Sequence, residues 1–219
     1  DPRRGNHGTQ RGAVKTVRDT AKALRAAGHT VHTPTHTGVG QRAHLASETN
    51  TLETHIRDVV GCIESEELSD VILCGHSYGG MVITGVADRL GKRIRALVYL
   101  DAFIPEHGDS LIGLLDKALA PEVAAMFIGG FRGAALENHS GMMQPIPAEV
   151  FNVSAANRAW VDRRCVPQAL ATFEMPLLLK GGADPALRRM YILADGWDPS
   201  PFRHFANQCS GKSGWDVVK

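Results

Sequence analysis

The stretch VILCGHSYGGMVITGVA, residues 71–87, indicates the local structure around which the fold is built. An apolar run rich in β-branched residues ends at Gly75, and an apolar segment of helical character begins within a few residues. Ser77 is therefore expected on a sharp turn between a strand and a helix. Gly75 and Gly79 supply the small neighbours that such a strained turn needs. We interpret the pattern as a nucleophile elbow.

An elbow of this kind gives the serine a defined chemical environment. It exposes the hydroxyl at the carboxyl edge of a parallel sheet, where the first N–H groups of the following helix converge. An oxyanion formed beside Ser77 would be stabilised by the Tyr78 N–H and by the positive end of the helix. The sequence thus predicts Ser77 as a nucleophile and Tyr78 as a residue of the oxyanion hole.

The composition is that of an ordinary globular protein and argues against two classes of partner. The 219 residues suffice for one domain with a large core, and we expect a single domain over residues 1–219. The net charge of +1 gives no field that would attract nucleic acid or an anionic membrane. The most apolar stretch, residues 123–131, is far shorter than a bilayer span, so no membrane segment is expected.

The first residues and the cysteines bear on where the protein works. The start, DPRRGN, has no apolar run typical of a signal peptide, and the missing initiator Met indicates processing or a partial sequence. The cysteines are scattered without a C-x-x-C spacing, and Cys74 lies in the strand expected to be most buried. We therefore predict free thiols and a cytoplasmic location.

Helical and strand-like segments alternate along most of the chain. Residues 1–17 have no periodicity and are expected to form a loop or arm, and Gly28 is a plausible C-cap for the helix that follows them. This order predicts a doubly wound, mostly parallel α/β sheet. We expect helices at 17–27, 51–65 and 202–209, a glycine loop at 38–44, and strands at 30–34, 94–103, 190–194 and 215–218.

The alternation breaks down in residues 106–175, which are expected to form an inserted helical cap. Helical pieces at 111–120 and 155–164 are separated by Gly129, Gly130, Gly133 and a proline turn at 145–147. The apolar residues of this region are either plain core or the lining of an apolar pocket. As candidate substrate-binding residues we take Met126 from the cap, with His76 and Phe103 from the strand ends.

Several motifs together resemble the α/β-hydrolase superfamily, in its branch of small esterases akin to plant methylesterases and hydroxynitrile lyases. The elbow GHSYGG at 75–80 with its flanks is the most specific of them. The resemblance covers roughly residues 18–219. The other matching pieces are LRAAGH at 24–29, TPT at 33–35 with the following Gly38, Gly40, Arg42 and His44, ALVYLDAFIP at 96–105, WVD at 160–162, LATFE at 170–174 and YI at 191–192.

The resemblance implies a serine nucleophile, a histidine base and an acid that orients the histidine, with no metal or organic cofactor. Ser77 matches the nucleophile. The acid matches either Asp101, at the end of the strand after the elbow helix, or Asp198 or Asp195 after the next strand. We favour Asp101, because Trp197 occupies the position that the family spacing gives to the later acid. As an alternative, Asp101 is a helix cap or turn residue.

Two parts of the family pattern are not matched. The family's first strand ends in His-Gly and completes the oxyanion hole, but the corresponding residues 4–7 cannot form a buried strand. His7-Gly8 lies about one residue from that position and is either a remnant or a coincidence. The family histidine follows the last strand, whereas the sequence ends at Lys219 within it. Neither His76 nor His204 stands in the right place, so the catalytic base is expected to be absent from these residues.

We therefore expect a serine hydrolase that cleaves a small apolar carboxylic ester, with a small molecule as its partner. The first alternative is a non-catalytic ligand-binding protein that keeps the hydrolase pocket without its base. The second is a hydroxynitrile-lyase-like enzyme, although Lys180 and Lys212 are not placed near the elbow by spacing. The close histidines at 29, 32, 36 and 44 lack a ligand-like arrangement, so no metal site is predicted.

Overall fold

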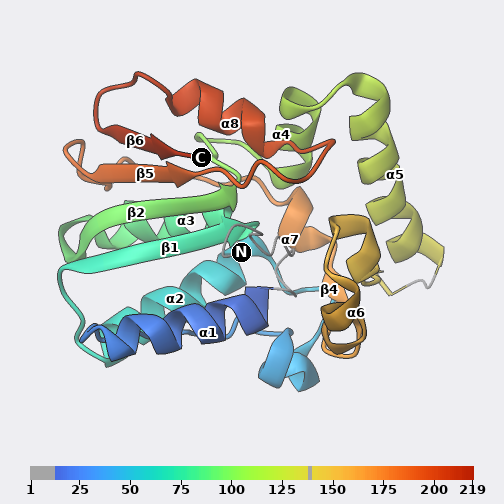
Figure 1. The fold of residues 1–219 in the computed structure, drawn as a ribbon, viewed down its shortest axis with the longest axis horizontal. Helices are drawn as coiled ribbons and strands as arrows, with labels where there is room; N and C mark the ends of the chain where they lie inside the picture. The colour runs from blue at the N-terminus through green and yellow to red at the C-terminus, as the bar shows by residue number, and fades with distance from the viewer. Residues whose placement is uncertain (1–12, 138–139) are drawn as a thin grey trace.

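The structure is a computed structural model that describes residues 13–137 and 140–219. Its centre is a parallel sheet of four strands in the order β1-β2-β5-β6 (Figure 1). These strands are β1 (Val71–Ser77), β2 (Ile94–Ala102), β5 (Arg188–Ile192) and β6 (Trp215–Val218). All four carboxyl ends meet at one edge, because Ser77 pairs with Ala102, and Ile192 pairs with both Leu100 and Val218.

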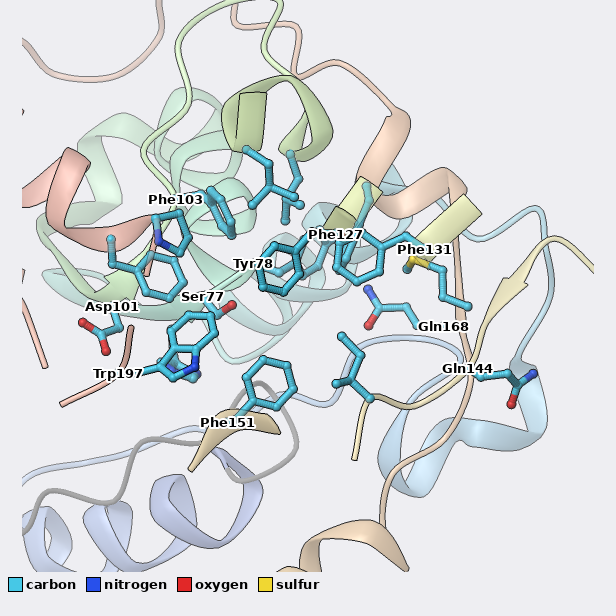
Figure 2. A pocket seen from close by; sticks show the side chains of 18 residues that line it. Ser77, Tyr78, Asp101, Phe103, Phe127, Phe131, Gln144, Phe151, Gln168 and Trp197 are labelled. Atoms are coloured by element: carbon cyan, nitrogen blue, oxygen red, sulfur yellow. The ribbon is translucent and has the colours of Figure 1, made fainter. Parts of the chain in front are cut away.

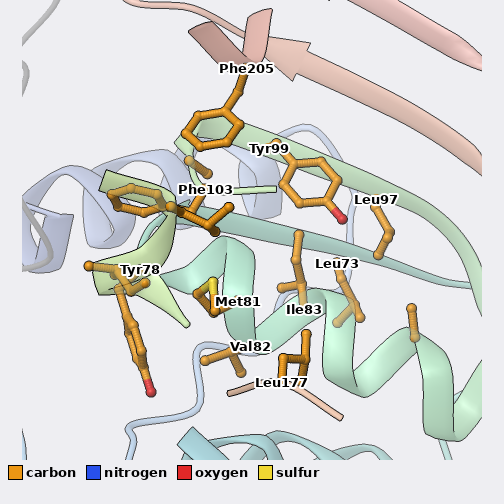
Figure 3. Close-up of a cluster of buried hydrophobic side chains, with 14 of the residues drawn as sticks. Leu73, Tyr78, Met81, Val82, Ile83, Leu97, Tyr99, Phe103, Leu177 and Phe205 are labelled. Carbon is orange, nitrogen blue, oxygen red and sulfur yellow. The ribbon is translucent and has the colours of Figure 1, made fainter. Parts of the chain in front are cut away.

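Helices pack on this sheet through apolar side chains. Helix α3 (Gly79–Leu90) contacts β1 and β2 and is itself covered by α2 (Leu52–Ser65), while α8 (Phe202–Cys209) packs on β2, β5 and β6. Met81, Val82 and Ile83 of α3 and Phe205 of α8 belong to one buried cluster with side chains of the strands (Figure 3). None of the described helices is long and apolar enough to cross a membrane.

The segment between β2 and β5 forms a separate group of short elements beside the carboxyl edge of the sheet (Figure 1). A two-stranded antiparallel ribbon ties it together, in which Met143 pairs with Gln168. The elements of this segment are α4 (Leu111–Ala118), α5 (Pro121–Glu137), β3 (Met142–Met143), η3 (Ala148–Phe151), α6 (Ala155–Asp162), β4 (Gln168–Ala169) and α7 (Ala171–Glu174).

The α/β fold with its mostly parallel sheet is confirmed, and so are several local predictions. Helix α2 begins after Thr51, whose hydroxyl caps the Thr54 N–H, and α8 and β6 have the bounds expected from the sequence. Helix α1 (Ala13–Ala26) starts earlier than expected and ends before Gly28, whose φ of +90° is suited to a C-cap. The short helices η1 (Gly40–Leu45) and η2 (Gly91–Arg93) complete the described elements.

Three local predictions are wrong. Residues 30–34 form no strand, because their mostly polar side chains offer no apolar face and Pro34 has no N–H for a ladder. Helix α5 runs through Gly129, Gly130 and Gly133, because burial of side chains such as Ile128 outweighs the low helix propensity of glycine. Cys74 is exposed rather than buried, because β1 is an edge strand of the described sheet. The predicted His7-Gly8 lies outside the described residues.

Candidate active site

Ser77 lies at the junction of β1 and α3 in a strained conformation. Its φ of +53° falls in the left-handed region, which residues other than glycine rarely adopt, and such strain often marks a functional site. Tyr78 follows as the N-cap residue of α3, so its backbone N–H lies at the positive end of the helix. The predicted elbow geometry is therefore present.

The glycines around Ser77 do not all serve the purpose expected from the sequence. A Cβ on Gly75 would lie 2.5 Å from the Gly79 carbonyl oxygen, so Gly75 is sterically required. A Cβ on Gly79 would meet no described atom within 4 Å, which contradicts the expected need for a small residue there. The second close approach is at Gly80, where a Cβ would lie 2.0 Å from the Phe103 carbonyl oxygen.

Asp101 lies near the end of β2, next to the strand that carries Ser77. It is 5% exposed, has a φ of +40°, and accepts a hydrogen bond of 2.7 Å from the Ala194 N–H. Burial raises the pKa of the Asp101 carboxyl to about 6, partly offset by the Ala194 hydrogen bond, with the charge of Asp195 adding to the rise. A carboxyl with this pKa can change its protonation state in the weakly acidic range.

A pocket opens between the carboxyl edge of the sheet and the segment that joins β2 to β5 (Figure 2). Ser77 and Asp101 both line this cavity of about 130 Å³, and most of its other walls are apolar or aromatic. The arrangement places a candidate nucleophile at the wall of an apolar, ligand-sized space. The lining side chains include Phe103, Leu111, Leu115, Phe127, Phe131, Met143, Ile146, Phe151, Phe173, Trp197, Pro201 and Phe202.

Residues 12–219 match the sequence profile of the alpha/beta hydrolase family. The chain belongs to the alpha/beta hydrolase family. A carbendazim hydrolyzing esterase of Nocardioides sp. (strain SG-4G) is 74% identical over 202 residues, which cover 92% of this chain and 84% of that relative. A probable esterase, PIR7A, of Oryza sativa subsp. indica is 31% identical over 103 residues, which cover 47% of this chain and 39% of the relative.

Solved structures agree with this assignment. An extracellular alpha/beta-hydrolase from a Paenibacillus species is 25% identical with a TM-score of 0.71, over 92% of this chain and 83% of that one. A pyrethroid hydrolase from Sphingobium faniae JZ-2 is 23% identical with a TM-score of 0.65, over 97% of this chain and 83% of that one, and shows the fold alone. The family and the named esterase together make this chain an esterase-type α/β hydrolase.

The hydrolase brings most of the residues predicted for the site together, and leaves two outside. His76, Ser77, Tyr78, Asp101 and Phe103 all line the pocket. Met126 does not, because it lies on the outer side of α5 with 62% of its surface exposed. Asp198 does not either: its side chain is 76% exposed and lies 3.6 Å from the Arg203 guanidinium. Its neighbour Trp197 faces the pocket instead.

Several lining residues of the hydrolase were not singled out from the sequence. Phe151, Gln168 and Trp197 belong to no motif that the sequence matched, and Phe173, within the matched LATFE piece, was not assigned to the pocket. Trp197 was noted only as the residue at the position of a family acid. Phe151, Gln168 and Phe173 lie in the region where a helical cap is expected, but large or amide side chains there do not distinguish pocket lining from core.

Behind the elbow, a buried polar cluster holds the Tyr78 side chain of the hydrolase. The Tyr78 hydroxyl lies 2.9 Å from His55 Nδ1, and His55 Nε2 lies 3.0 Å from the Thr37 carbonyl oxygen. That carbonyl can only accept, so Nε2 carries the proton and Nδ1 accepts from Tyr78. Burial lowers the pKa of His55 and, to about 3, that of His36, whose ring stacks on His55. Both rings are therefore neutral, and Tyr78 is held as a donor.

Histidine, lysine and metal-binding groups are sparse at the pocket. His76 is the one histidine among its described lining residues, and no lysine lines it within the described part of the chain. His204 lies on α8 against Gln208. The described residues also contain no group of three or more His, Cys, Asp or Glu side chains arranged to hold a metal ion.

Proposed function

We propose that this hydrolase cleaves a small, largely apolar carboxylic or carbamic ester through an acyl-enzyme on Ser77. The observation that carries the proposal is Ser77 itself, strained at the start of α3 and facing the apolar pocket. In this reaction Ser77 Oγ attacks the carbonyl carbon, and the Tyr78 N–H stabilises the negative oxygen. The bond to the alcohol breaks, the alcohol leaves with a proton, and water then releases the acid and restores Ser77.

The lining of the pocket supports an apolar and partly aromatic substrate. Phe127, Phe151 and Trp197 present flat faces and edges to the cavity, which suit the offset packing of another aromatic ring. The 74% identical relative is named for hydrolysis of carbendazim, a flat benzimidazole that carries a methyl carbamate. Carbendazim is therefore the first substrate that we propose for this chain.

The proposed mechanism needs an acid and a base beside Ser77. We assign the acid to Asp101, which is buried at the pocket, in preference to the exposed Asp198. For the base we propose a histidine that follows β6, since Val218 pairs with Ile192 at the same edge of the sheet. The base would take the proton from Ser77 and pass it to the leaving alcohol.

Hydrolysis by the full-length protein that contains these 219 residues, compared with its Ser77→Ala variant, tests this proposal. The substrates are 4-nitrophenyl acetate, indoxyl acetate and carbendazim, and the melting temperatures of the two proteins show whether both are folded. We expect turnover that the variant lacks, by a factor of about 10³ or more. Turnover that survives in a folded Ser77→Ala protein would contradict the role of Ser77.

A second candidate is a ligand-binding protein on the same scaffold. It is favoured by one observation: among the described lining residues, the only histidine is His76, the residue before Ser77 in the same strand. Such a protein would bind carbendazim without hydrolysing it. Quenching of tryptophan fluorescence measures this binding, because Trp197, one of the three tryptophans, lines the pocket. Binding without turnover in a folded chain would favour this candidate over the esterase.

A further inference from the structure

Gln168 is a buried polar residue in a pocket that is otherwise mostly apolar. It lies in β4, opposite Met143 in the antiparallel ribbon, and is 6% exposed. Figure 2 shows its amide directed from this ribbon toward the side of the pocket where Ser77 lies. Gln168 and Ser77 therefore belong to different walls of one cavity.

The hydrogen bonds of Thr172 determine which way the Gln168 amide is turned. The Thr172 hydroxyl donates its one proton to the Ala169 carbonyl oxygen at 2.6 Å, so toward Gln168 it can only accept. Its partner at 2.9 Å must then be the amide nitrogen Nε2. Thr172 is itself only 1% exposed, so this hydrogen bond is shielded from water. Gln168 Oε1 is therefore turned away from Thr172.

Gln168 Oε1 accepts no hydrogen bond from the described part of the chain. It is not among the fully enclosed polar atoms that lack a partner, so Oε1 keeps some exposed surface, and Figure 2 shows the amide on the side of the pocket. Removing an amide oxygen from bulk water without a partner is unfavourable, and a methionine or leucine would fill the position without that cost. The amide is thus better explained by a ligand than by packing.

We propose that Gln168 Oε1 accepts a hydrogen bond from an N–H group of the substrate. The substrate class is then a small aromatic or heteroaromatic ester or carbamate that carries an N–H away from the reacting carbonyl. The inference rests on the proposed function and narrows it, because one fixed acceptor among apolar walls orients a ligand that apolar contacts alone would leave free to turn. Carbendazim belongs to this class through its ring N–H.

Matched pairs of esters test the hydrogen bond. Indoxyl acetate is compared with 1-methylindoxyl acetate, and carbendazim with its 1-methyl analogue, in the full-length protein and in its Gln168→Met variant. We expect kcat/KM for the N–H members to fall about tenfold in Gln168→Met, and the values for the N-methyl members to change less than about twofold. The quantity of interest is the change in the ratio of N–H to N-methyl rates between the two proteins, because this comparison cancels the bulk of the methyl group.

Two controls separate recognition from structure. Gln208→Met changes an exposed glutamine of α8 and should leave the ratio as in the original chain. Thr172→Val removes the anchor of the Gln168 amide and should lower the ratio, whereas Thr172→Ser keeps a hydroxyl and should restore it. Hydrolysis of 4-nitrophenyl acetate, which has no N–H, reports general damage to the pocket.

The outcomes distinguish this inference from the proposed function. An equal loss on both members of each pair would overturn the inference and assign Gln168 a structural role. Tryptophan fluorescence measures how tightly the Ser77→Ala protein binds the N–H and N-methyl members of each pair. The ratio of these affinities reports the hydrogen bond without catalysis. A preference in binding without any hydrolysis would overturn the esterase and keep the hydrogen bond. Hydrolysis without a preference would overturn the hydrogen bond alone, and absence of both would overturn both.

Discussion

Asp101 and Asp198 are both aspartates but lie in different environments, so the assignment of the acid can be tested with one substitution at each position. Asp101 is buried at the pocket, and Asp198 is exposed beside Arg203. If Asp101 orients the base, Asp101→Asn should lower kcat by about 10³-fold or more, because an amide favours the wrong tautomer of a histidine. Asp198→Asn should change kcat less than about twofold. Steady-state hydrolysis of 4-nitrophenyl acetate measures both.

Asp101→Asn should also change the melting temperature in a way that depends on pH. Because burial raises the folded pKa of Asp101 from 3.8 to about 6, the folded state binds more protons than the unfolded state between these values. The favourable contribution of the protonated carboxyl is therefore complete below about pH 4 and is lost as the pH rises through about 6. Asp101→Asn should match the original melting temperature at pH 4 and exceed it at pH 8. A gap that shrinks with rising pH would contradict the assigned environment of Asp101.

At the scale of elements, the elbow helix α3 approaches β2 at Gly80 rather than at Gly79. Gly80→Ala would place a Cβ against the Phe103 backbone, which cannot move aside like a flexible side chain. We expect Gly80→Ala to lower the free energy of unfolding by about 3 kcal/mol. Gly79→Ala, with no described atom near its Cβ, should be neutral or stabilise by up to about 1 kcal/mol through helix propensity. Urea denaturation of the two variants measures the difference, and equal losses would contradict it.

Elements with their own local signal could be predicted from the sequence, and the others could not. Residues 71–90 combine a β-branched run, a glycine turn and an apolar helix, and the fold keeps all three. Helix α5 was expected to break at Gly129 because propensity is local, whereas the packing that holds the helix comes from distant segments. The strand expected at 30–34 rested on a short β-branched pattern without an apolar face, which specifies no partner.

At the scale of the whole molecule, one part of the candidate site could be predicted from the sequence and another part could not. Ser77 and Asp101 end neighbouring strands, so their meeting follows from the parallel sheet that the sequence predicted. The far wall of the pocket could not be predicted, because Gln168 and Trp197 reach it only through the packing of the inserted segment on the core. Met126 was a reasonable choice by composition, but the rotation of α5 turns Phe127 to the pocket and leaves Met126 outside.

Trp197 packs against both apolar clusters of the described residues and thereby links η3 and α6 to the core. Its ring packs against Phe202 of α8, with centroids 6.3 Å apart, and against Phe151 of η3, at 5.6 Å. Phe151 belongs to the smaller cluster, whose other members include Val153 and Val161 and which is formed by η3, α6 and the residues between them. Trp197 is thus a half-buried side chain that both clusters share.

Replacing Trp197 should therefore destabilise η3 and α6 more than the central sheet. Trp197→Ala removes the shared ring and is expected to lower the free energy of unfolding by about 2 kcal/mol, less than for a fully buried tryptophan. Trp197→Phe keeps an aromatic ring but loses part of the indole's contact area and the Nε1–H donor to the Val150 carbonyl, so its loss should be smaller, about 1 kcal/mol. Amide hydrogen exchange locates the effect: in Trp197→Ala, protection should fall in α6 and η3 while β1 and α3 keep theirs. An equal loss of protection in η3, α6, β1 and α3 would contradict this expectation. It would mean that these elements unfold as one unit without the Trp197 ring, through other contacts between them.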